Sequence, residues 1–256
     1  QYHPAKRVAW LTSELPKTLA RADMLITDSE QVRRELIEVY AVDEKKVRAI
    51  HLGASARYAP QTAAQTQATM DRYGLKHGQY LLFVGTLEPR KGVNTLLESW
   101  ANLPADLKQA FPLVLAGAPG WGNKILQDRI QTLSQNDGLR HLSFVPAGEL
   151  SALYAGASAF VYPSHYEGFG LPILEAMSCG VPVICTADTS LSEITGEHAL
   201  LVQSGNTEQL TAQIQQLLEN ETLRTSLSSA GLLRSRNFSW KKCAEQTQEI
   251  YRNIAG

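Results

Sequence analysis

Two glutamates flank a glycine-rich turn in the segment 163–176. Glu167 precedes the turn, and Glu175 lies eight residues later, inside a helix that we expect to begin at Pro172. A carboxylate repels phosphate, so both side chains are better suited to accepting hydrogen bonds from hydroxyl groups, such as those of a sugar or a ribose. The alternative is structural: Glu175 would compensate the helix dipole, and Glu167 would be a surface loop residue.

The same turn supplies backbone donors. Pro172 keeps Leu171 extended and pre-forms the first helical turn. The N–H groups near Phe169, Gly170 and Leu171 then lack intrahelical partners and are free to bind an anion. The sequence therefore predicts an anion site at this helix start, shaped by the side chains of Tyr166 and Phe169.

Two adjacent cations, Arg90 and Lys91, lie in the loop 85–92, which follows another expected strand. Cations are unfavourable at a helix start because the macrodipole there already favours anions. We therefore expect the pair to face an anion, with a solvated pair on a turn as the alternative. The loop lacks the Walker spacing, and the absence of Gly-x-Gly-x-x-Gly argues against a nicotinamide dehydrogenase.

Other candidates carry weaker predictions. His165 is interpreted as a packing or hydrogen-bonding residue, with ligand binding as the alternative, and Trp121 either covers a base or anchors its glycine loop. Cys179 and Cys185 are expected to be small buried residues. The segment 190–193 is expected to be a capped helix start.

Six apolar runs of strand length alternate with helical patterns over residues 78–237. Runs that are apolar throughout are typical of parallel strands covered on both faces, so we predict an α/β fold with a doubly wound sheet. Ligands of such sheets bind beyond the carboxyl ends of the strands, where both loops described above lie. The expected strands are 80–84, 113–116, 142–145, 159–162, 183–185 and 200–202, and the expected helices between them are 94–103, 124–135, 149–156, 172–178 and 191–195.

Outside this region the pattern changes. We expect a linker over 54–69, which is rich in Ala, Gln and Thr and has no apolar period. The first residues predict a helix over 13–22 capped by Ser13, a strand over 24–27, a helix over 30–40 capped by Asp28 and Ser29, and a strand over 47–53; the last predict helices near 207–219, 221–234 and 240–253.

Composition narrows the class of protein. Of the 256 residues, 44% are hydrophobic, which excludes a disordered chain. The 24 Lys and Arg residues are balanced by 25 Asp and Glu residues, so the chain lacks the basic excess that is typical of nucleic-acid-binding proteins. Three cysteines cannot form a disulfide framework, and so few cysteines are typical of a protein in a reducing compartment. Their spacing matches no zinc-binding pattern. No apolar run approaches ~20 residues, and the first residues do not match a signal peptide, because no apolar stretch follows their charges. Because an amphipathic pattern is under way from the start, without an initiator Met, we expect a piece of a longer protein.

The segment that begins at Glu167, Glu-Gly-Phe-Gly-Leu-Pro-Ile-Leu-Glu, resembles the E-x7-E signature of the retaining glycosyltransferase family 4. Residues 83–92 resemble the donor-phosphate loop of that family, and the resemblance runs from about residue 10 to residue 254. It implies a GT-B fold, with a complete C-terminal donor domain and only the end of the N-terminal acceptor domain. The implied parts are an acceptor-domain remnant over 1–53, a linker and first helix over 54–77, the nucleotide-sugar-binding domain over 78–237 and, over 238–256, a helix that crosses back.

The resemblance also implies residue roles. The expected catalytic residues are Arg90 and Lys91, which would clamp the donor diphosphate, and Glu167, which would hold hydroxyls of the transferred sugar. Glu175 would bind the ribose. Many members place an arginine where this chain has Thr86, which leaves open how the phosphate charge is shared. The expected donor-binding residues are Gly85, Thr86, Gly117, Val145, Phe169, Gly170, Leu171 and Glu175.

The implied activity is retaining transfer of a sugar from a nucleotide diphosphate donor to a glycan or lipid-linked acceptor. The phosphate loop resembles that of bacterial mannosyltransferases of polysaccharide and lipopolysaccharide assembly, which makes GDP-mannose the expected donor. A UDP-sugar such as UDP-glucose is one alternative, and a non-catalytic nucleotide-sugar-binding module is another, since this chain alone would lack most of the acceptor domain. We expect no cofactor, no metal and no nucleic-acid partner, because no Asp-x-Asp occurs and the cations and amides would neutralise the leaving group. The expected location is the cytoplasm, with any peripheral membrane contact at the inner face made by the preceding part of the protein.

Overall fold

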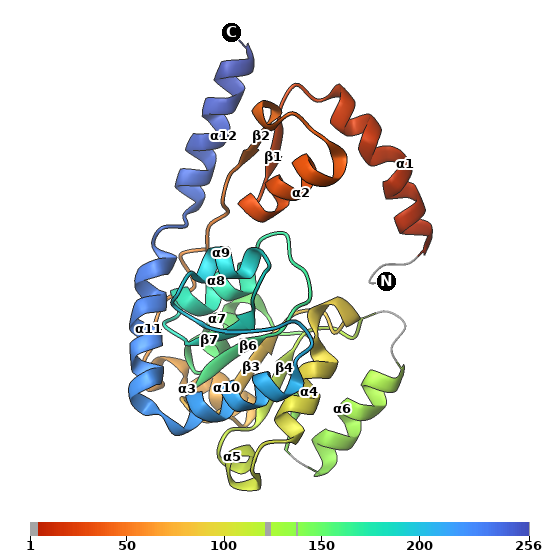
Figure 1. Cartoon of the computed structure of the whole chain (residues 1–256). Helices are drawn as coiled ribbons and strands as arrows, with labels where there is room; N and C mark the ends of the chain where they lie inside the picture. Colours follow the sequence, from red (N-terminus) through yellow and green to blue (C-terminus); the bar gives the residue numbers. More distant parts are fainter. Residues whose placement is uncertain (1–4, 121–123, 137, 256) are drawn as a thin grey trace.

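The computed structural model describes residues 5–120, 124–136 and 138–255. The chain forms a small lobe and a large lobe, and two crossing segments join them (Figure 1). The small lobe consists of α1 (Ala5–Arg21), β1 (Leu25–Thr27), α2 (Glu30–Tyr40), the 3₁₀ turn η1 (Glu44–Lys46) and β2 (Val47–Ala49). Its two strands pair in parallel.

The large lobe is built on a parallel sheet of six strands in the order β5-β4-β3-β6-β7-β8. Its central strands are buried apolar runs apart from the half-buried Val84, which is why their alternation with helices identifies them in the sequence. The prediction of an α/β, doubly wound sheet is confirmed. The strands are β3 (Leu81–Val84), β4 (Leu113–Ala116), β5 (Arg140–Leu142), β6 (Ala159–Tyr162), β7 (Val183–Thr186) and β8 (Leu200–Val202).

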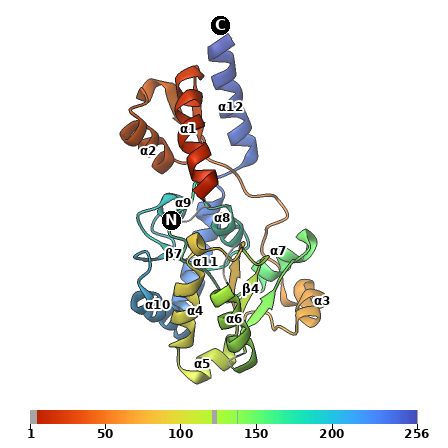
Figure 2. The same ribbon diagram turned by 90° about the vertical axis from the view of Figure 1, so that its right-hand side faces the viewer.

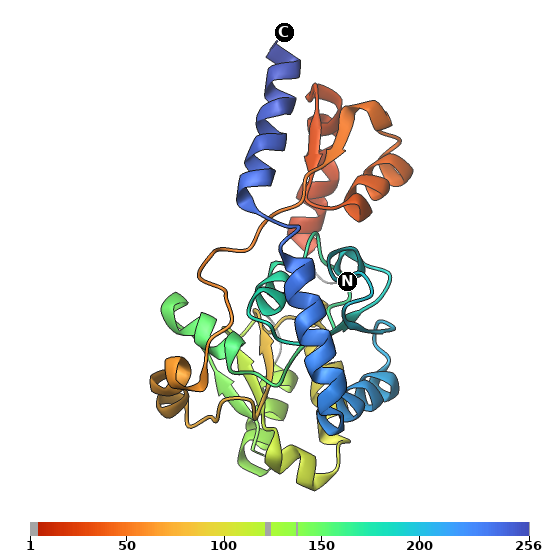
Figure 3. The same cartoon turned by 90° about the vertical axis from the view of Figure 1, so that its left-hand side faces the viewer.

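Helices cover both faces of this sheet (Figures 1 and 3). On one face α4 packs against α10, and on the other face α3, α7, α8 and α11 pack in sequence against one another. The helical elements are α3 (Ala63–Tyr73), η2 (Pro89–Lys91), α4 (Val93–Ala101), α5 (Ala105–Ala110), α6 (Lys124–Asn136), α7 (Ala147–Ala155), α8 (Leu171–Ser178), α9 (Ser190–Thr195), α10 (Thr207–Glu219), α11 (Glu221–Ser235) and α12 (Trp240–Ala255).

The lobes meet where the chain crosses between them. The linker after β2 passes the connection between α11 and α12 at Gly53, where an added Cβ would lie 2.2 Å from the backbone nitrogen of Trp240. Only glycine permits this approach of two backbones. From the crossing, α12 runs beside the small lobe, on the side of β1 and β2 opposite α1 (Figure 1). Figure 2 shows α1 and α12 at the same end of the molecule.

The structure corrects two sequence predictions at helix starts. The helix expected over 13–22 instead spans Ala5–Arg21, with Pro16 in its interior, and the Ser13 hydroxyl donates to the Trp10 carbonyl at 2.9 Å rather than capping a helix. The expected linker 54–69 ends early, because Thr62 and Gln65 form a capping box that starts α3. The cap at Ser29 is confirmed, since its side chain accepts from the backbone N–H of Val32.

Strand limits differ at the edges of the sheets. The strand expected over 47–53 ends at Ala49, and the strand expected over 142–145 lies at Arg140–Leu142. The second is an edge strand whose residues are half-exposed and partly charged, so an apolar run does not mark it. The sequence analysis predicts no helix where the short helix α5 lies. Among the described residues, none of the helices combines the length and apolar character that a membrane span requires.

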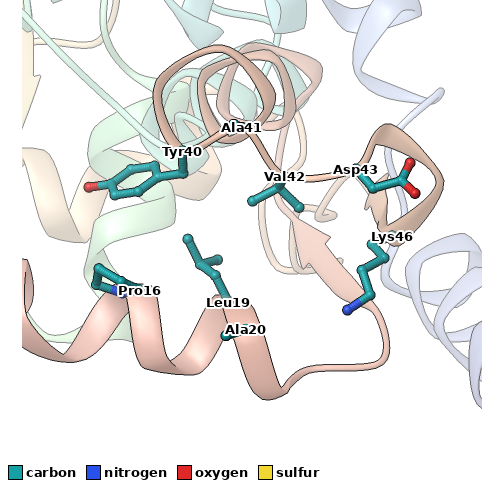
Figure 4. Close-up of a pocket in the computed structure, with 8 residues that line it drawn as sticks. All are labelled: Pro16, Leu19, Ala20, Tyr40, Ala41, Val42, Asp43 and Lys46. Carbon is teal, nitrogen blue, oxygen red and sulfur yellow. The ribbon is translucent and has the colours of Figure 1, made fainter.

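A cavity of about 290 Å³ separates α1 from the turn that follows α2 (Figure 4). The side chains of Leu19, Tyr40 and Val42 border it, with Asp43 and Lys46 at one end. It belongs to the small lobe and lies apart from the loops at the carboxyl end of the large sheet.

Candidate active site

The two loops singled out in the sequence meet at the switch point of the large sheet. From β3 the strand order runs outward through β4 to β5, and it then restarts on the other side of β3 with β6. The loops after β3 and β6 therefore leave neighbouring strands in opposite directions, which opens a crevice at the carboxyl ends of the strands.

Gly92 allows these loops to touch. Its φ is +66°, and an added Cβ would lie 2.0 Å from the carbonyl oxygen of Pro163. A larger residue would have to push the loops apart. The contact continues through the backbone N–H of His165, which donates to the carbonyl of Arg90 at 2.8 Å.

The carboxylate of Glu167 is the centre of the contact. Its Oε1 accepts from Lys91 Nζ at 2.6 Å, Ser164 Oγ at 2.8 Å and the Tyr162 hydroxyl at 3.0 Å. Its Oε2 pairs with Arg90 Nη1 at 3.0 Å. Three donors saturate Oε1, whereas Oε2 keeps room for one further donor.

Charge keeps this carboxylate ionised. Burial raises the pKa of Glu167, but the charges of Lys91 and Arg90 and the hydrogen bonds from Lys91 and Ser164 lower it more. The pKa therefore lies below its ordinary value of 4.5. At neutral pH Glu167 can only accept hydrogen bonds.

The two cations differ in how far the protein uses them. Arg90 donates to the Tyr166 carbonyl at 2.5 Å and to Glu88 Oε1 at 2.8 Å, besides pairing with Glu167. Lys91 contacts Glu167 and the Tyr162 hydroxyl, the latter at 2.5 Å, which leaves one of its three N–H donors. Arg90 thus links the two loops, while Lys91 can still bind a ligand.

The start of α8 lies where the sequence predicts backbone donors for an anion, and that role stays a prediction. Gly170 is the N-cap residue with φ +115°, and its position has no side-chain cap. The helix begins at Leu171 rather than at the expected Pro172, so Leu171 is helical and not extended as predicted. The side chain of Phe169 does not line this end but is buried, with its ring centroid 6.0 Å from His51 and 6.1 Å from Phe238.

Glu175 lies one turn into α8 in a different environment. Its neighbours are the phenols of Tyr58, from the linker, and Tyr154, from α7. Burial raises the pKa of Glu175 above its ordinary value, and the two phenols and Arg57 offset only part of that rise. The Tyr154 hydroxyl is buried and completes no hydrogen bond. The structure does not bring Glu175 into the cluster around Glu167.

The other expected donor-binding residues lie around the same crevice. Gly85 and Gly117 follow β3 and β4 and touch, since a Cβ on Gly117 would lie 2.0 Å from the Gly85 carbonyl oxygen. Thr86 is exposed, and Val145 is half-buried against the core. Trp121 lies outside the described residues.

The remaining candidates have structural partners. His165 Nδ1 lies 2.7 Å from Ser204 Oγ, and burial lowers the pKa of His165. Cys179 and Cys185 are buried free thiols, as expected. The helix expected to start within 190–193 begins at Ser190, and its cap is Thr189. In the part of the chain that the structure describes, no group of three His, Cys, Asp or Glu side chains is arranged to hold a metal.

Sequence reasoning missed the residues that hold the two glutamates. Tyr162 and Ser164 contact Glu167, and Tyr58 and Tyr154 surround Glu175. Tyr162 carries a usable signal, because it ends the strand that leads into the loop and a hydroxyl at a strand end reaches the crevice. The two phenols around Glu175 come from elements far apart in the sequence.

A doubly wound domain with this strand order has the fold of one half of a GT-B type protein, and solved structures agree in fold. The chain superposes on sucrose-phosphate synthase from Thermosynechococcus elongatus with a TM-score of 0.79 and 26% identity, covering 93% of this chain and 60% of that one. It superposes on WaaG, a glycosyltransferase involved in lipopolysaccharide biosynthesis, with a TM-score of 0.78 and 19% identity, covering 98% of this chain and 72% of WaaG.

The family follows from the sequence match. The family model described as "Glycosyl transferases group 1" matches residues 66–234, and the chain belongs to this family, GT4. A curated relative, the O-antigen chain mannosyltransferase B of Escherichia coli, is 36% identical over 252 residues, which is 98% of this chain. The chain spans 66% of the length of that relative.

Proposed function

We propose that the protein transfers mannose from GDP-mannose to a glycan or lipid-linked acceptor with retention of configuration, and that this chain holds its donor-binding half. The observation that carries the proposal is the ion-pair cluster of Glu167, Lys91 and Arg90 at the switch point, beside the uncapped start of α8. The similarity to an O-antigen mannosyltransferase supports the choice of mannose. The cytoplasmic location stays a prediction.

The proposed chemistry assigns each group a task. The bond between the anomeric carbon and the diphosphate oxygen breaks, and its electrons go to the diphosphate. The acceptor hydroxyl forms the new bond on the same face of the sugar and passes its proton to the departing diphosphate oxygen. Lys91 and the free N–H groups at the start of α8 stabilise the negative charge of the departing diphosphate.

Glu167 and Arg90 would position the sugar. The open acceptor position on Glu167 Oε2 suits one sugar hydroxyl, and Arg90 keeps the carboxylate turned toward the crevice through its 3.0 Å contact. Glu175 would accept the ribose hydroxyls. Gly85, Thr86, Gly117 and Val145 would line the nucleotide, since they border the same crevice.

Calorimetric titration of this chain with GDP, UDP and ADP tests the donor. We expect GDP to bind most tightly, and tighter binding of UDP would overturn the choice of base. We also propose that no divalent metal takes part, so excess chelator should leave GDP binding unchanged. Loss of binding in chelator would contradict that part.

Turnover needs a separate experiment, because the chain is shorter than its relatives. We expect this chain to bind GDP-mannose and the longer protein, carrying the preceding acceptor segment, to transfer mannose. Binding without transfer in both would favour the non-catalytic binding module.

A further inference from the structure

The loop 164–170 is held through its own backbone. Three consecutive carbonyl oxygens, those of residues 166, 167 and 168, each accept a hydrogen bond from a different element. Their donors are Arg90 Nη1 at 2.5 Å, Ser190 Oγ at 2.7 Å and Ser29 Oγ at 2.7 Å. The first two belong to the large lobe and the third to the small lobe, so the small lobe takes part in fixing the loop that carries Glu167.

The helix α2 makes this contact from the small lobe. Ser29, its fully buried N-cap residue, accepts from Val32 N–H at 3.2 Å while donating to Gly168. Further along α2, Glu35 accepts from the Tyr166 hydroxyl at 2.6 Å. The helix therefore touches the loop at two points.

A carboxylate from the large lobe holds the start of α2. Glu193, on α9, accepts from the backbone N–H groups of Glu30 at 2.9 Å and Gln31 at 3.1 Å, and its Oε1 lies 2.5 Å from His51 Nε2. The positive end of the helix dipole faces this carboxylate, which strengthens the contact. Burial raises the pKa of Glu193, but the hydrogen bonds from His51 and both amides lower it below its ordinary value.

Capping of the helix does not by itself require Glu193. Ser29 already serves the usual N-cap position of α2. Glu193 reaches across from the other lobe to the two N–H groups that Ser29 leaves unserved. The arrangement ties α2 to α9, the element that also supplies Ser190 to the same loop.

We propose that Glu193 is a positioning residue for the donor sugar: it holds the start of α2 against the large lobe, and Ser29 then fixes Gly168 and the adjoining Glu167. The inference rests on the proposed function for its effect on the donor. Glu193 touches no reacting group. Its loss should therefore loosen the loop and weaken binding of the sugar part of the donor more than of the nucleotide part.

Hydrogen–deuterium exchange of the ligand-free chain tests the mechanical part. Glu193→Gln puts an NH₂ donor opposite a backbone N–H, so one of the two bonds to α2 is lost. We expect amides of residues 164–171 to exchange about tenfold faster in Glu193→Gln and in Ser29→Ala, because each variant loses a hydrogen bond of the same chain of contacts. Glu197→Gln, an exposed glutamate four residues further on, should exchange like the wild type.

Titration with GDP and with GDP-mannose tests the functional part. In both variants GDP-mannose should bind about tenfold more weakly while GDP changes less than about twofold, and the double variant should be no weaker than the weaker single one. A variant that merely destabilised the fold would weaken both ligands alike.

The two readouts separate two failures. If the wild type binds neither ligand, the proposed function is wrong, and exchange over 164–171 still decides the inference. Unchanged exchange in a folded Glu193→Gln variant would overturn it, as would an effect of Ser29→Ala that Glu193→Gln does not share. If Glu193→Gln fails to fold, Ser29→Ala alone must speed exchange at the loop, and its failure to do so overturns the inference.

Discussion

Glu167 and Glu175 lie on either side of one turn, yet their surroundings are opposite. The carboxylate of Glu167 is buried between two cations and two hydroxyls, and the two cations together with the Ser164 hydroxyl lower its pKa. The carboxylate of Glu175 is next to two phenols, and burial raises its pKa. Two ion pairs keep Glu167 ionised, whereas burial makes ionisation of Glu175 less favourable.

The difference arises from the elements that flank α8. The loop after β3 approaches the front of the turn and supplies Lys91 and Arg90. The linker and α7 approach the side of the helix and supply Tyr58 and Tyr154. The spacing of the glutamates along the chain therefore does not make them equivalent.

The largest effect is expected from Lys91→Ala. This change removes the cation whose remaining N–H donor would bind the diphosphate, and loss of one partner of a buried charge pair between protein and ligand costs about 2–5 kcal/mol of binding free energy. GDP affinity should fall by roughly two orders of magnitude or more. Calorimetric titration of the folded variant measures it.

Lys45→Ala is the matched control, because Lys45 is an exposed lysine of the small lobe. It should bind GDP like the wild type. Equal GDP affinity of Lys91→Ala and the wild type would show that the cluster around Glu167 is structural only.

A smaller effect is expected from Glu175→Gln. If Glu175 accepts ribose hydroxyls, the amide removes charge-assisted bonds worth roughly 1.5–3 kcal/mol, and GDP affinity should fall at least about tenfold. If Glu175 only compensates the helix dipole, the free energy of unfolding should fall by ~0.3–1 kcal/mol while the affinity for GDP stays unchanged. Titration and thermal unfolding of the same variant distinguish the two.

A nucleotide without ribose hydroxyls is the control for Glu175. Dideoxy-GDP should bind the wild type and Glu175→Gln almost equally, since the hydroxyl partners are already gone. A full loss of affinity for dideoxy-GDP in the variant would place the effect in the fold rather than at the ribose.

The sequence alone predicts the large sheet and the crevice. Buried apolar strands such as 113–116 and 159–162 have the expected limits, and the order of strands and helices places the loops after β3 and β6 at the carboxyl edge. Local chemistry also predicts the caps that depend on near neighbours, as at Ser29. These features depend on patterns only a few residues long.

The partners of the site residues could not be predicted in the same way. Tyr58 reaches Glu175 from 117 positions earlier in the chain, and Glu193 reaches α2 across the lobe contact. Such contacts depend on how the linker and lobes pack, which no local pattern records. The helix α1 shows the same limit, since eight helical residues precede the local cap signal at Ser13.

The smallest expected effect is on the pH dependence of stability, and it tests the contrast between the two glutamates directly. The lowered pKa of Glu167 means that its contribution to stability is present above the ordinary value of 4.5 and is lost as the pH falls below it. The raised pKa of Glu175 has the opposite sign, because the folded state holds that proton more tightly, so stability is lost as the pH rises above 4.5. Relative to the wild type, Glu167→Gln should therefore become less stable with rising pH, and Glu175→Gln should become more stable. Denaturant unfolding between pH 3 and about pH 7, with Glu197→Gln as the exposed control, measures the two slopes. Slopes of the same sign would mean that the cations around Glu167 and the burial of Glu175 do not shift the two pKa values in opposite directions.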